Sequence, residues 1–213
     1  MIKKLLLLIT TVCLAFNVSC KKNSKYDGKI SQLRNDVFTY DCTDFCLTVY
    51  SEFVETPLLN DGVKGKIENV LTFKLKNKNA SNNFENCHLS FNLNKKDYSK
   101  NFEFKQIPSL LICTVVVEEL PSSKFDVMLT INGKSQAIAL NSVKNKSTKS
   151  YVEVLKSLEK EEEFSNKINE NVELRIRLIN NDGYDYWFVG IIDEKTTTSY
   201  LIDGETLEIV AKK

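Results

Sequence analysis

The residues able to do chemistry are few in this chain of 213 residues. His88 is the only histidine, so a His-centred catalytic triad would have to use it. It follows Cys87 in a run of strand character, and no G-x-S-x-G sequence presents a nucleophilic serine. We therefore expect His88 to have a structural or surface role and the protein not to be an enzyme.

Six cysteines are spread along the chain, and four of them are candidate disulfide partners: Cys42, Cys46, Cys87 and Cys113. An even number of cysteines is typical of an exported protein whose cysteines pair as disulfides. Of the three connectivities we favour Cys87 with Cys113 and Cys42 with Cys46. Buried unpaired thiols are the alternative. A zinc site is disfavoured because the spacing lacks the paired short knuckles of structural zinc sites, so we expect no metal and no cofactor.

Paired carboxylates are the chemistry of glycoside hydrolysis, and four aspartates stand near predicted strand ends or turns: Asp182, Asp185, Asp193 and Asp203. Aspartate is favoured at such places because it hydrogen-bonds the local backbone. Phosphate-binding glycine motifs are absent from the sequence. An exported hydrolase with converging carboxylates is the rival to a non-catalytic protein.

The chain begins with the layout of an export signal. Lys3 and Lys4 precede an apolar or weakly polar run of twelve residues, from Leu5 to Phe16, and the chain turns polar at Lys21. A spanning helix needs about 20 residues, so a cleaved signal over residues 1–19 is favoured over a permanent span.

The residues Asn17-Val18-Ser19-Cys20 resemble the bacterial lipobox, with Asn17 in the place where the lipobox usually has leucine. The resemblance implies that Cys20 becomes the first residue of the mature chain. Acyl chains on its thiol would then hold the protein at a membrane. Residues 20–29 would then be a polar tether. The alternatives are a plain cut near Cys20 that releases a secreted protein, or a secreted eukaryotic glycoprotein using the triplets that begin at Asn79 and Asn145.

Charge excludes one class of partner. Without residues 1–19 the chain has 27 basic and 28 acidic residues, a net charge of about −1. Nucleic-acid binding depends on clustered positive charge, so we expect no nucleic-acid partner.

Residues 30–143 show short strand-like runs separated by turns: 46–54, 69–76, 87–94 and 109–117. Asn132-Gly133, between two alternating runs in 125–140, predicts a two-residue hairpin. Strands at this spacing favour an antiparallel β-sandwich, immunoglobulin-like in general architecture.

Residues 144–150 have little apolar content and are typical of a linker. In 151–213 the pattern changes to a helix that begins at Tyr151, capped by Ser147 or Ser150, with 159–164 as its last turns. Strands follow at 172–179, 184–193 and 198–213, the last with a break at Asp203-Gly204. The expected fold class is mainly β, all-β plus α+β, with this helix packed on a three- to four-stranded antiparallel meander.

The segment 184–213 resembles the end of a PepSY-type repeat, through aromatic-apolar alternation and a final signature of Asp, Gly and Thr. The matching residues are Tyr186, Trp187, Val189, Tyr200, Ile202, Asp203, Thr206, Leu207 and Val210. The resemblance covers about 65 residues and implies a small non-catalytic module that binds or restrains a partner in the cell envelope.

Aromatic residues are densest around Trp187, which the alternation places in the core of a central strand. Tyr186 and Phe188 would then lie on the opposite side as an interaction surface, because aromatic anchors dominate interfaces. We expect a non-enzymatic lipoprotein at the outer face of a membrane, with an envelope partner that the sequence does not identify.

Overall fold

The structure is a computed structural model that describes residues 25–26, 28–56, 65–79, 83–105, 110–169, 171–193 and 196–213, and these residues are mainly in strands. In chain order the strands are β1 (Ile30–Asp41), β2 (Phe45–Thr56), β3 (Lys66–Asn77), β4 (His88–Leu93), β5 (Lys96–Asn101), β6 (Glu103–Lys105), β7 (Leu110–Val117), β8 (Lys124–Ile131), β9 (Lys134–Ser142), β10 (Glu173–Asn181), β11 (Tyr184–Ile192), β12 (Thr197–Asp203) and β13 (Ile209–Lys212). Within this part of the chain two helices, α2 (Tyr151–Leu158) and α3 (Glu162–Lys167), lie between β9 and β10.

Strands and hairpins form where short sequence patterns predict them. In β3 the alternate residues Leu71, Phe73 and Leu75 are almost fully buried, as a strand with one core face requires. Asn132 and Gly133 have φ values of 51° and 79° and join β8 to β9, which pair along their whole length. Both residues tolerate positive φ, so the predicted two-residue hairpin is confirmed.

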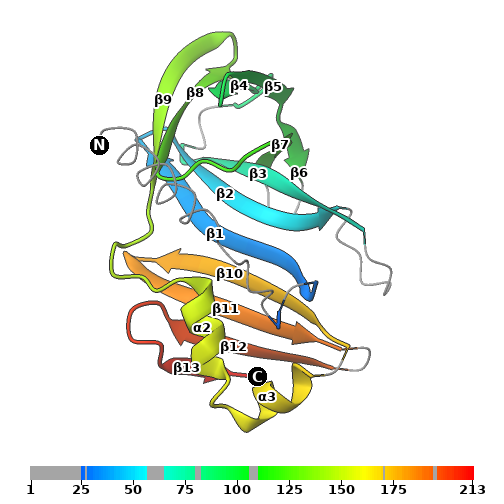
Figure 1. The fold of residues 1–213 in the computed structure, drawn as a ribbon. Helices are drawn as coiled ribbons and strands as arrows, with labels where there is room; N and C mark the ends of the chain where they lie inside the picture. Colours follow the sequence, from blue (N-terminus) through cyan, green and yellow to red (C-terminus); the bar gives the residue numbers. More distant parts are fainter. Residues whose placement is uncertain are drawn as a thin grey trace, which may run out of the picture.

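The N-terminal strands form a nearly closed, barrel-like sheet (Figure 1). β1 pairs with β2 on one side and with β9 on the other; β3 and β7 follow β2, whereas β8, β4 and β5 follow β9. Side chains bridge the remaining gap between β5 and β7: Lys100 Nζ donates to the carbonyl oxygen of Thr114 at 2.8 Å, and Tyr98 Oη accepts from the amide of Glu118 at 3.2 Å. An immunoglobulin-like sandwich of two separate sheets is not confirmed, because β1 is long enough to pair with strands on both sides.

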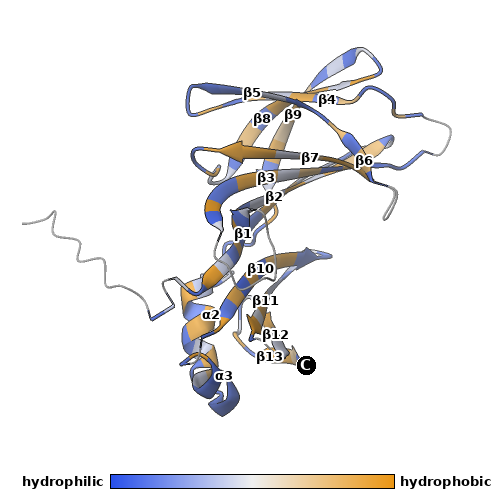
Figure 2. Cartoon of the chain, turned by 90° about the vertical axis from the view of Figure 1, so that its right-hand side faces the viewer, coloured by the Kyte–Doolittle hydropathy of each residue, from blue (hydrophilic) through white to orange (hydrophobic). Residues whose placement is uncertain are grey.

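The C-terminal strands continue the same sheet. β10, β11, β12 and β13 pair in sequence order as antiparallel neighbours, and β10 also pairs in parallel with the first half of β1. Figure 2 shows α2 and α3 on one face of these strands. Their buried side chains, including Leu155 and Phe164, share one apolar cluster with Trp187 and Tyr200, separate from the cluster inside the barrel. Burial of these two clusters provides most of the favourable free energy of folding.

The helical segment differs from expectation in its second half. Ser150 caps α2 in a reciprocal capping box with Glu153, as one of the two expected caps. The helix ends at Leu158 and does not continue through 159–164. The chain turns there, Ser165 Oγ donates to the carbonyl oxygen of Glu159 at 2.6 Å, and α3 begins at Glu162. The turn brings Phe164 into the apolar cluster with none of its surface exposed, and burial of that ring offsets the lost helical hydrogen bonds.

The segments expected to be tether and linker both contact the C-terminal sheet or its helices. Tyr26, within the expected tether, is buried in the C-terminal cluster. In the expected linker, the Lys149 amide donates to the carbonyl oxygen of Gly204 at 2.7 Å, and Trp187 Nε1 donates to the carbonyl oxygen of Lys149 at 3.0 Å. The division into domains 30–143 and 151–213 stays a prediction, since β1 pairs with strands of both parts.

Candidate binding surface

The two faces of β11 have different environments. Trp187 and Val189 point into the C-terminal cluster and have no exposed surface, which confirms the prediction that Trp187 is a core residue. Tyr186 and Phe188 lie on the opposite face, away from the helices, and are half-buried. Gly190 makes room for the Phe188 ring, because a Cβ at Gly190 would lie 3.2 Å from Cε1 of that ring. Phe188 therefore rests on the sheet with part of its ring open to solvent.

Phe188 belongs to a row of residues that crosses five strands on the helix-free face. Directly paired residues of neighbouring strands share a face of the sheet. The pairings run from β12 to β2 through Leu201, Phe188, Arg177, Arg34 and Glu52. We call these five residues the arginine–aromatic row. The Arg177 guanidinium carbon lies 5.7 Å from the centre of the Phe188 ring, within the range of a cation–π contact.

Hydrogen bonds fix the charged part of the row. Arg177 Nε donates to Gln32 Oε1 at 2.7 Å, and Gln32 Nε2 donates to Glu52 Oε1 at 3.1 Å. Arg34 donates to the same oxygen of Glu52 at 2.6 Å and stacks on Tyr50, with its guanidinium carbon 3.7 Å from the ring centre. Burial lowers the pKa of Arg177 from its ordinary value, although the group remains charged at neutral pH. The surface thus combines half-buried aromatic rings with two arginines and one carboxylate.

This network was not expected from the sequence. Gln32 and Glu52 are almost fully buried, with 4% and 6% of their surface exposed, yet both are ordinary polar residues of strands. The only available signal was the row of polar residues Gln32, Arg34 and Asp36 in a segment that also carries Leu33 and Val37. That alternation predicts a strand with one polar face, and it does not reveal that Gln32 is almost fully buried beside Glu52 and Arg177.

The strand-end aspartates Asp185, Asp193 and Asp203 accept hydrogen bonds from different groups. Asp185 accepts from the Asn145 amide at 2.7 Å, from Asn180 Nδ2 at 2.7 Å and from Thr148 Oγ1. Asp203 accepts from two amides of its own turn, which lower its pKa. Asp193 likewise accepts from the amide and hydroxyl of Thr196. Asp182 occupies a turn position with a φ of 51°. Asp193 and Asp203 thus serve local hydrogen bonding, as aspartates in turns commonly do, whereas Asp185 holds residues 145 and 148 of the expected linker against β11.

A further buried carboxylate lies at the seam between barrel and C-terminal sheet. Asp36 is 8% exposed and accepts from the Val37 amide at 2.8 Å and from Ser142 Oγ at 2.6 Å. Burial raises its pKa, and this effect outweighs the lowering by the two hydrogen bonds. Sequence reasoning did not single out Asp36.

His88 and the four described cysteines each contact neighbouring strands or the barrel core. His88 Nε2 contacts Ser99 Oγ at 2.8 Å across the hairpin of β4 and β5. Cys87 and Cys113 are buried in the barrel, where burial raises the pKa of each thiol to about 11. All four described cysteines are free thiols, so the favoured pairings of Cys87 with Cys113 and of Cys42 with Cys46 are absent from the structure. Cys42 instead donates to the carbonyl oxygen of Phe45 at 3.4 Å.

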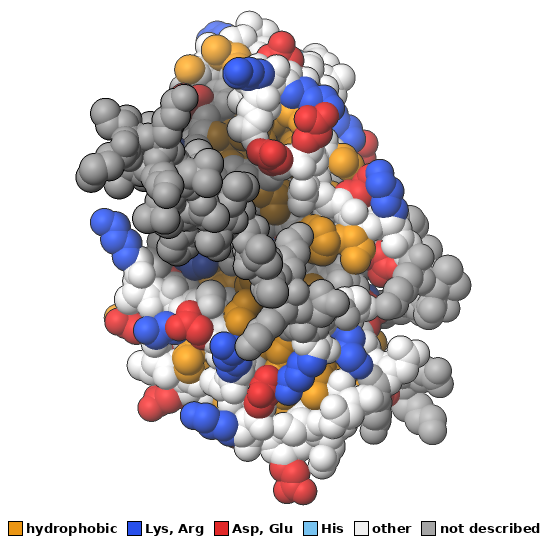
Figure 3. Space-filling view, viewed as in Figure 1, with side chains coloured by type: hydrophobic (Ala, Val, Ile, Leu, Met, Phe, Trp, Pro, Cys, Tyr) orange, Lys and Arg blue, Asp and Glu red, His pale blue; other side chains and the backbone are white. Residues whose placement is uncertain are grey.

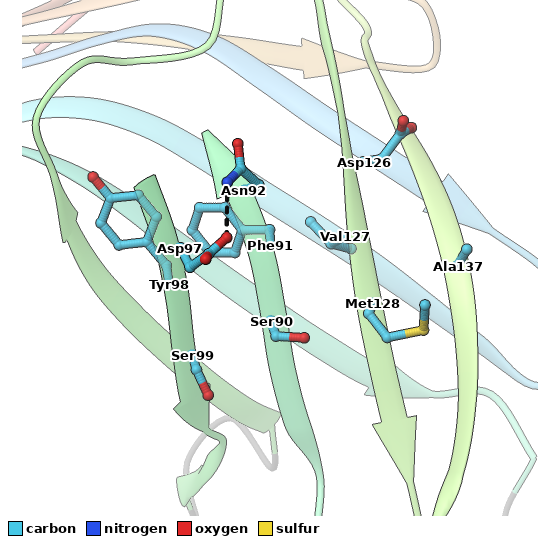
Figure 4. Close-up of a pocket in the computed structure, with 10 residues that line it drawn as sticks. All are labelled: Ser90, Phe91, Asn92, Asp97, Tyr98, Ser99, Asp126, Val127, Met128 and Ala137. Atoms are coloured by element: carbon cyan, nitrogen blue, oxygen red, sulfur yellow. Dashed lines mark hydrogen bonds between the residues drawn. The ribbon is translucent and has the colours of Figure 1, made fainter. Parts of the chain in front are cut away.

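A shallow cleft opens where β4 and β8 diverge (Figure 4). The two strands pair only from His88 to Ser90, and beyond that point Phe91 and Val127 form an apolar floor. Tyr98 stacks on Phe91 with ring centres 5.0 Å apart. The cleft has a volume of about 460 Å³, and Asp97 on its rim is hydrogen-bonded to Asn92 at 2.7 Å. It is an opening onto the barrel core.

Cys20, the expected lipidation site, lies outside the described residues. In the described ranges, no three or more His, Cys, Asp or Glu side chains gather closely enough to hold a metal ion, and no helix is long and apolar enough to cross a membrane. Neither a family model, nor a curated protein, nor a solved structure matches this chain.

Proposed function

We propose that the protein is a non-enzymatic, exported lipoprotein that binds a partner at the outer face of a membrane through the helix-free face of its C-terminal sheet. The observation that carries the binding role is the arginine–aromatic row. Phe188 and Tyr186 are half-buried aromatic side chains on the face that neither α2 nor α3 covers. Next to Phe188 in the row stands Arg177, whose partner on β1 is Arg34. Aromatic and arginine side chains are the residues that most often carry interface energy.

The chemistry of the face defines the partner that we propose. Rings such as Phe188 favour apolar or aromatic groups, and the two arginines outnumber the one carboxylate of the row. An extended protein segment with acidic and apolar side chains would complement both properties. The anchoring at the membrane rests on the lipobox-like residues ending at Cys20.

The finer fold assignments belong to the same proposal. A helix followed by an antiparallel meander, α2 then β10 to β13, is the arrangement that the PepSY resemblance implies. We propose that the C-terminal part is a PepSY-like module and the N-terminal part a β-sandwich relative with a nearly closed edge. A shared fold would not by itself assign an activity.

The anchoring is tested by the Cys20→Ala variant expressed in a bacterium that processes lipoproteins. We expect the wild-type chain in the membrane fraction with acyl chains on Cys20 by intact mass, and the variant in the soluble exported fraction. An unmodified or absent residue 20 in the wild-type protein overturns the anchoring. Glycans on Asn79 or Asn145 in a eukaryotic host would instead support the secreted glycoprotein.

The binding face is tested by a photo-crosslinking amino acid placed at Phe188 in the anchored protein, with the same group at Val152 as control. Val152 is 41% exposed on α2, which packs on the other face of the sheet. We expect one discrete cross-linked protein from position 188, lost when Tyr186 is changed to Ala, and none from position 152. Equal products from both positions, or none from position 188, contradict the proposal.

A further inference from the structure

Tyr26, the second of the described residues, is fixed to both helices. The Tyr26 ring packs against Phe164 of α3, with ring centres 6.4 Å apart, and only 4% of the residue is exposed. Its hydroxyl donates to Glu159 Oε1 at 2.5 Å, just after α2 ends, and Lys25 Nζ bridges the same carboxylate at 3.0 Å. Burial of the ring and two polar contacts therefore hold this point of the chain against the turn between α2 and α3.

The chain stays fixed after Tyr26. The Lys29 amide donates to the carbonyl oxygen of Tyr26 at 3.0 Å, and the Leu174 amide donates to the carbonyl oxygen of Lys29 at 2.7 Å. Ile30 then starts the parallel pairing of β1 with β10. These contacts hold the described residues 26, 29 and 30, so a tether from Cys20 to Tyr26 contains only the five residues 21–25.

That length limits where a membrane can lie. Six Cα–Cα steps separate Cys20 from Tyr26, and a fully extended chain of this length spans about 20 Å. We infer that the lipid surface faces the α2–α3 corner, residues 155–164, and that Tyr26 holds the protein in this orientation. The inference rests on the proposed function, because it requires acyl chains on Cys20.

Charge does not explain this orientation. The exposed residues in and beside the corner include Lys25 and Lys160 as well as Glu159 and Glu162. Figure 3 shows basic and acidic side chains interspersed over the helix-bearing face. A surface of mixed sign has no strong attraction for an anionic membrane. The short tether alone would bring the corner to the bilayer, which leaves the opposite, helix-free face accessible to a partner.

The experiment measures the distance of two surface sites from the membrane in the lipidated protein. A fluorophore is introduced as a non-canonical amino acid at Lys160 in the corner or at Lys134 in the hairpin of β8 and β9, which lies at the far end of the molecule from α3 (Figure 1). Thiol labels are unsuitable because of the four free cysteines. The protein, purified from membranes, is placed in vesicles of neutral lipid with an energy acceptor on a fraction of the headgroups.

We expect severalfold more energy transfer from position 160 than from position 134. Insertion of ten Gly-Ser residues after Lys22 leaves every described contact intact and should bring the ratio close to one, because a longer flexible tether lets the body turn. Tyr26→Ala should lower the ratio in the same direction, whereas Tyr26→Phe keeps the buried ring and should retain most of the difference.

Failure of the proposed orientation and failure of the proposed anchoring give different results. A ratio near one in the membrane-bound wild-type protein, or a ratio that the insertion leaves unchanged, overturns the orientation and leaves the anchoring intact. Wild-type protein that does not stay with vesicles overturns the anchoring and the orientation with it.

Discussion

Arg177 of β10 and Gln32 of β1 are joined by a hydrogen bond of 2.7 Å from Nε to Oε1. These residues are 145 positions apart in the chain, and the bond connects the C-terminal sheet to the network around Glu52 in the barrel. The same interactions that fix the arginines of the helix-free face thus also hold the two parts of the molecule together.

Removal of Glu52 should be costly. Glu52→Ala leaves Arg34, which is 16% exposed, without its carboxylate, and removes the acceptor of Gln32. Breaking a buried pair at one partner costs about 3 kcal/mol of unfolding free energy. Glu118→Ala is the control, since its bridge to Lys96 is exposed and such pairs contribute below about 1 kcal/mol. Urea unfolding of the two variants measures the difference; equal losses would show that Glu52 carries no special role.

Asp36 should make stability fall as pH rises. Its folded pKa is raised above the ordinary value of 3.8, so the folded state holds the proton more tightly than the unfolded state. Its stabilising contribution is therefore largest at low pH and declines from about pH 4 upward, through the folded pKa. The unfolding free energy of Asp36→Asn, minus that of the wild type, should increase with pH over this range.

Ser142 provides the check on that assignment. Its hydroxyl donates to Asp36 and lowers the carboxyl pKa, so Ser142→Ala should raise this pKa further and make the decline with pH steeper. The measurement is again urea unfolding at a series of pH values. A pH dependence that is the same in wild type, Asp36→Asn and Ser142→Ala would assign it to other groups.

Cys87 and Cys113 should react slowly with alkylating reagents in the folded protein. Burial raises the pKa of each thiol to about 11, compared with the ordinary value of 9.0, so at pH 8 the thiolate fraction is about a hundredfold smaller. Peptide mapping after iodoacetamide treatment should find both unmodified in native protein and modified after unfolding in urea. Residues that resist alkylation in urea until a reductant is added would instead be in disulfides.

A side chain at Gly204 should destabilise the protein. A Cβ at this position would lie 2.7 Å from the carbonyl oxygen of Asp185, which accepts the Gly204 amide at 2.8 Å. We expect Gly204→Ala to cost about 2 kcal/mol, because both sides of the contact are backbone and cannot move independently. Gly133→Ala is the control: its φ of +79° is unfavourable for alanine, but no atom lies within 4 Å, so about 1 kcal/mol is expected. Thermal or urea unfolding ranks the two.

Several elements could be predicted from short stretches of sequence. The Asn132-Gly133 hairpin, the strands from β10 to β13 and the start of α2 at Ser150 each depend on residues within one or two turns of chain. The burial of Trp187 and the half-exposed positions of Tyr186 and Phe188 followed from the period of one strand. These features depend on interactions between residues that are close together in the chain.

Other features could not be predicted in this way. Residues 20–29 looked like a tether because they are polar, yet Tyr26 finds a buried position on helices that begin 125 residues later. The stretch 159–164 looked like the solvated end of one helix, yet burial of Phe164 favours a turn and a second helix. In both cases one aromatic ring outweighs the polar residues around it.

The sequence by itself determined where strands, turns and helix caps form, because hydrophobic period and turn residues act over a few positions. Only the tertiary structure decided that β1 pairs with β10, that Arg177 meets Gln32 and that Tyr26 meets Glu159. Those partners are far apart in the chain. They are selected by the burial of the surfaces that they form together, and no single segment contains such a surface.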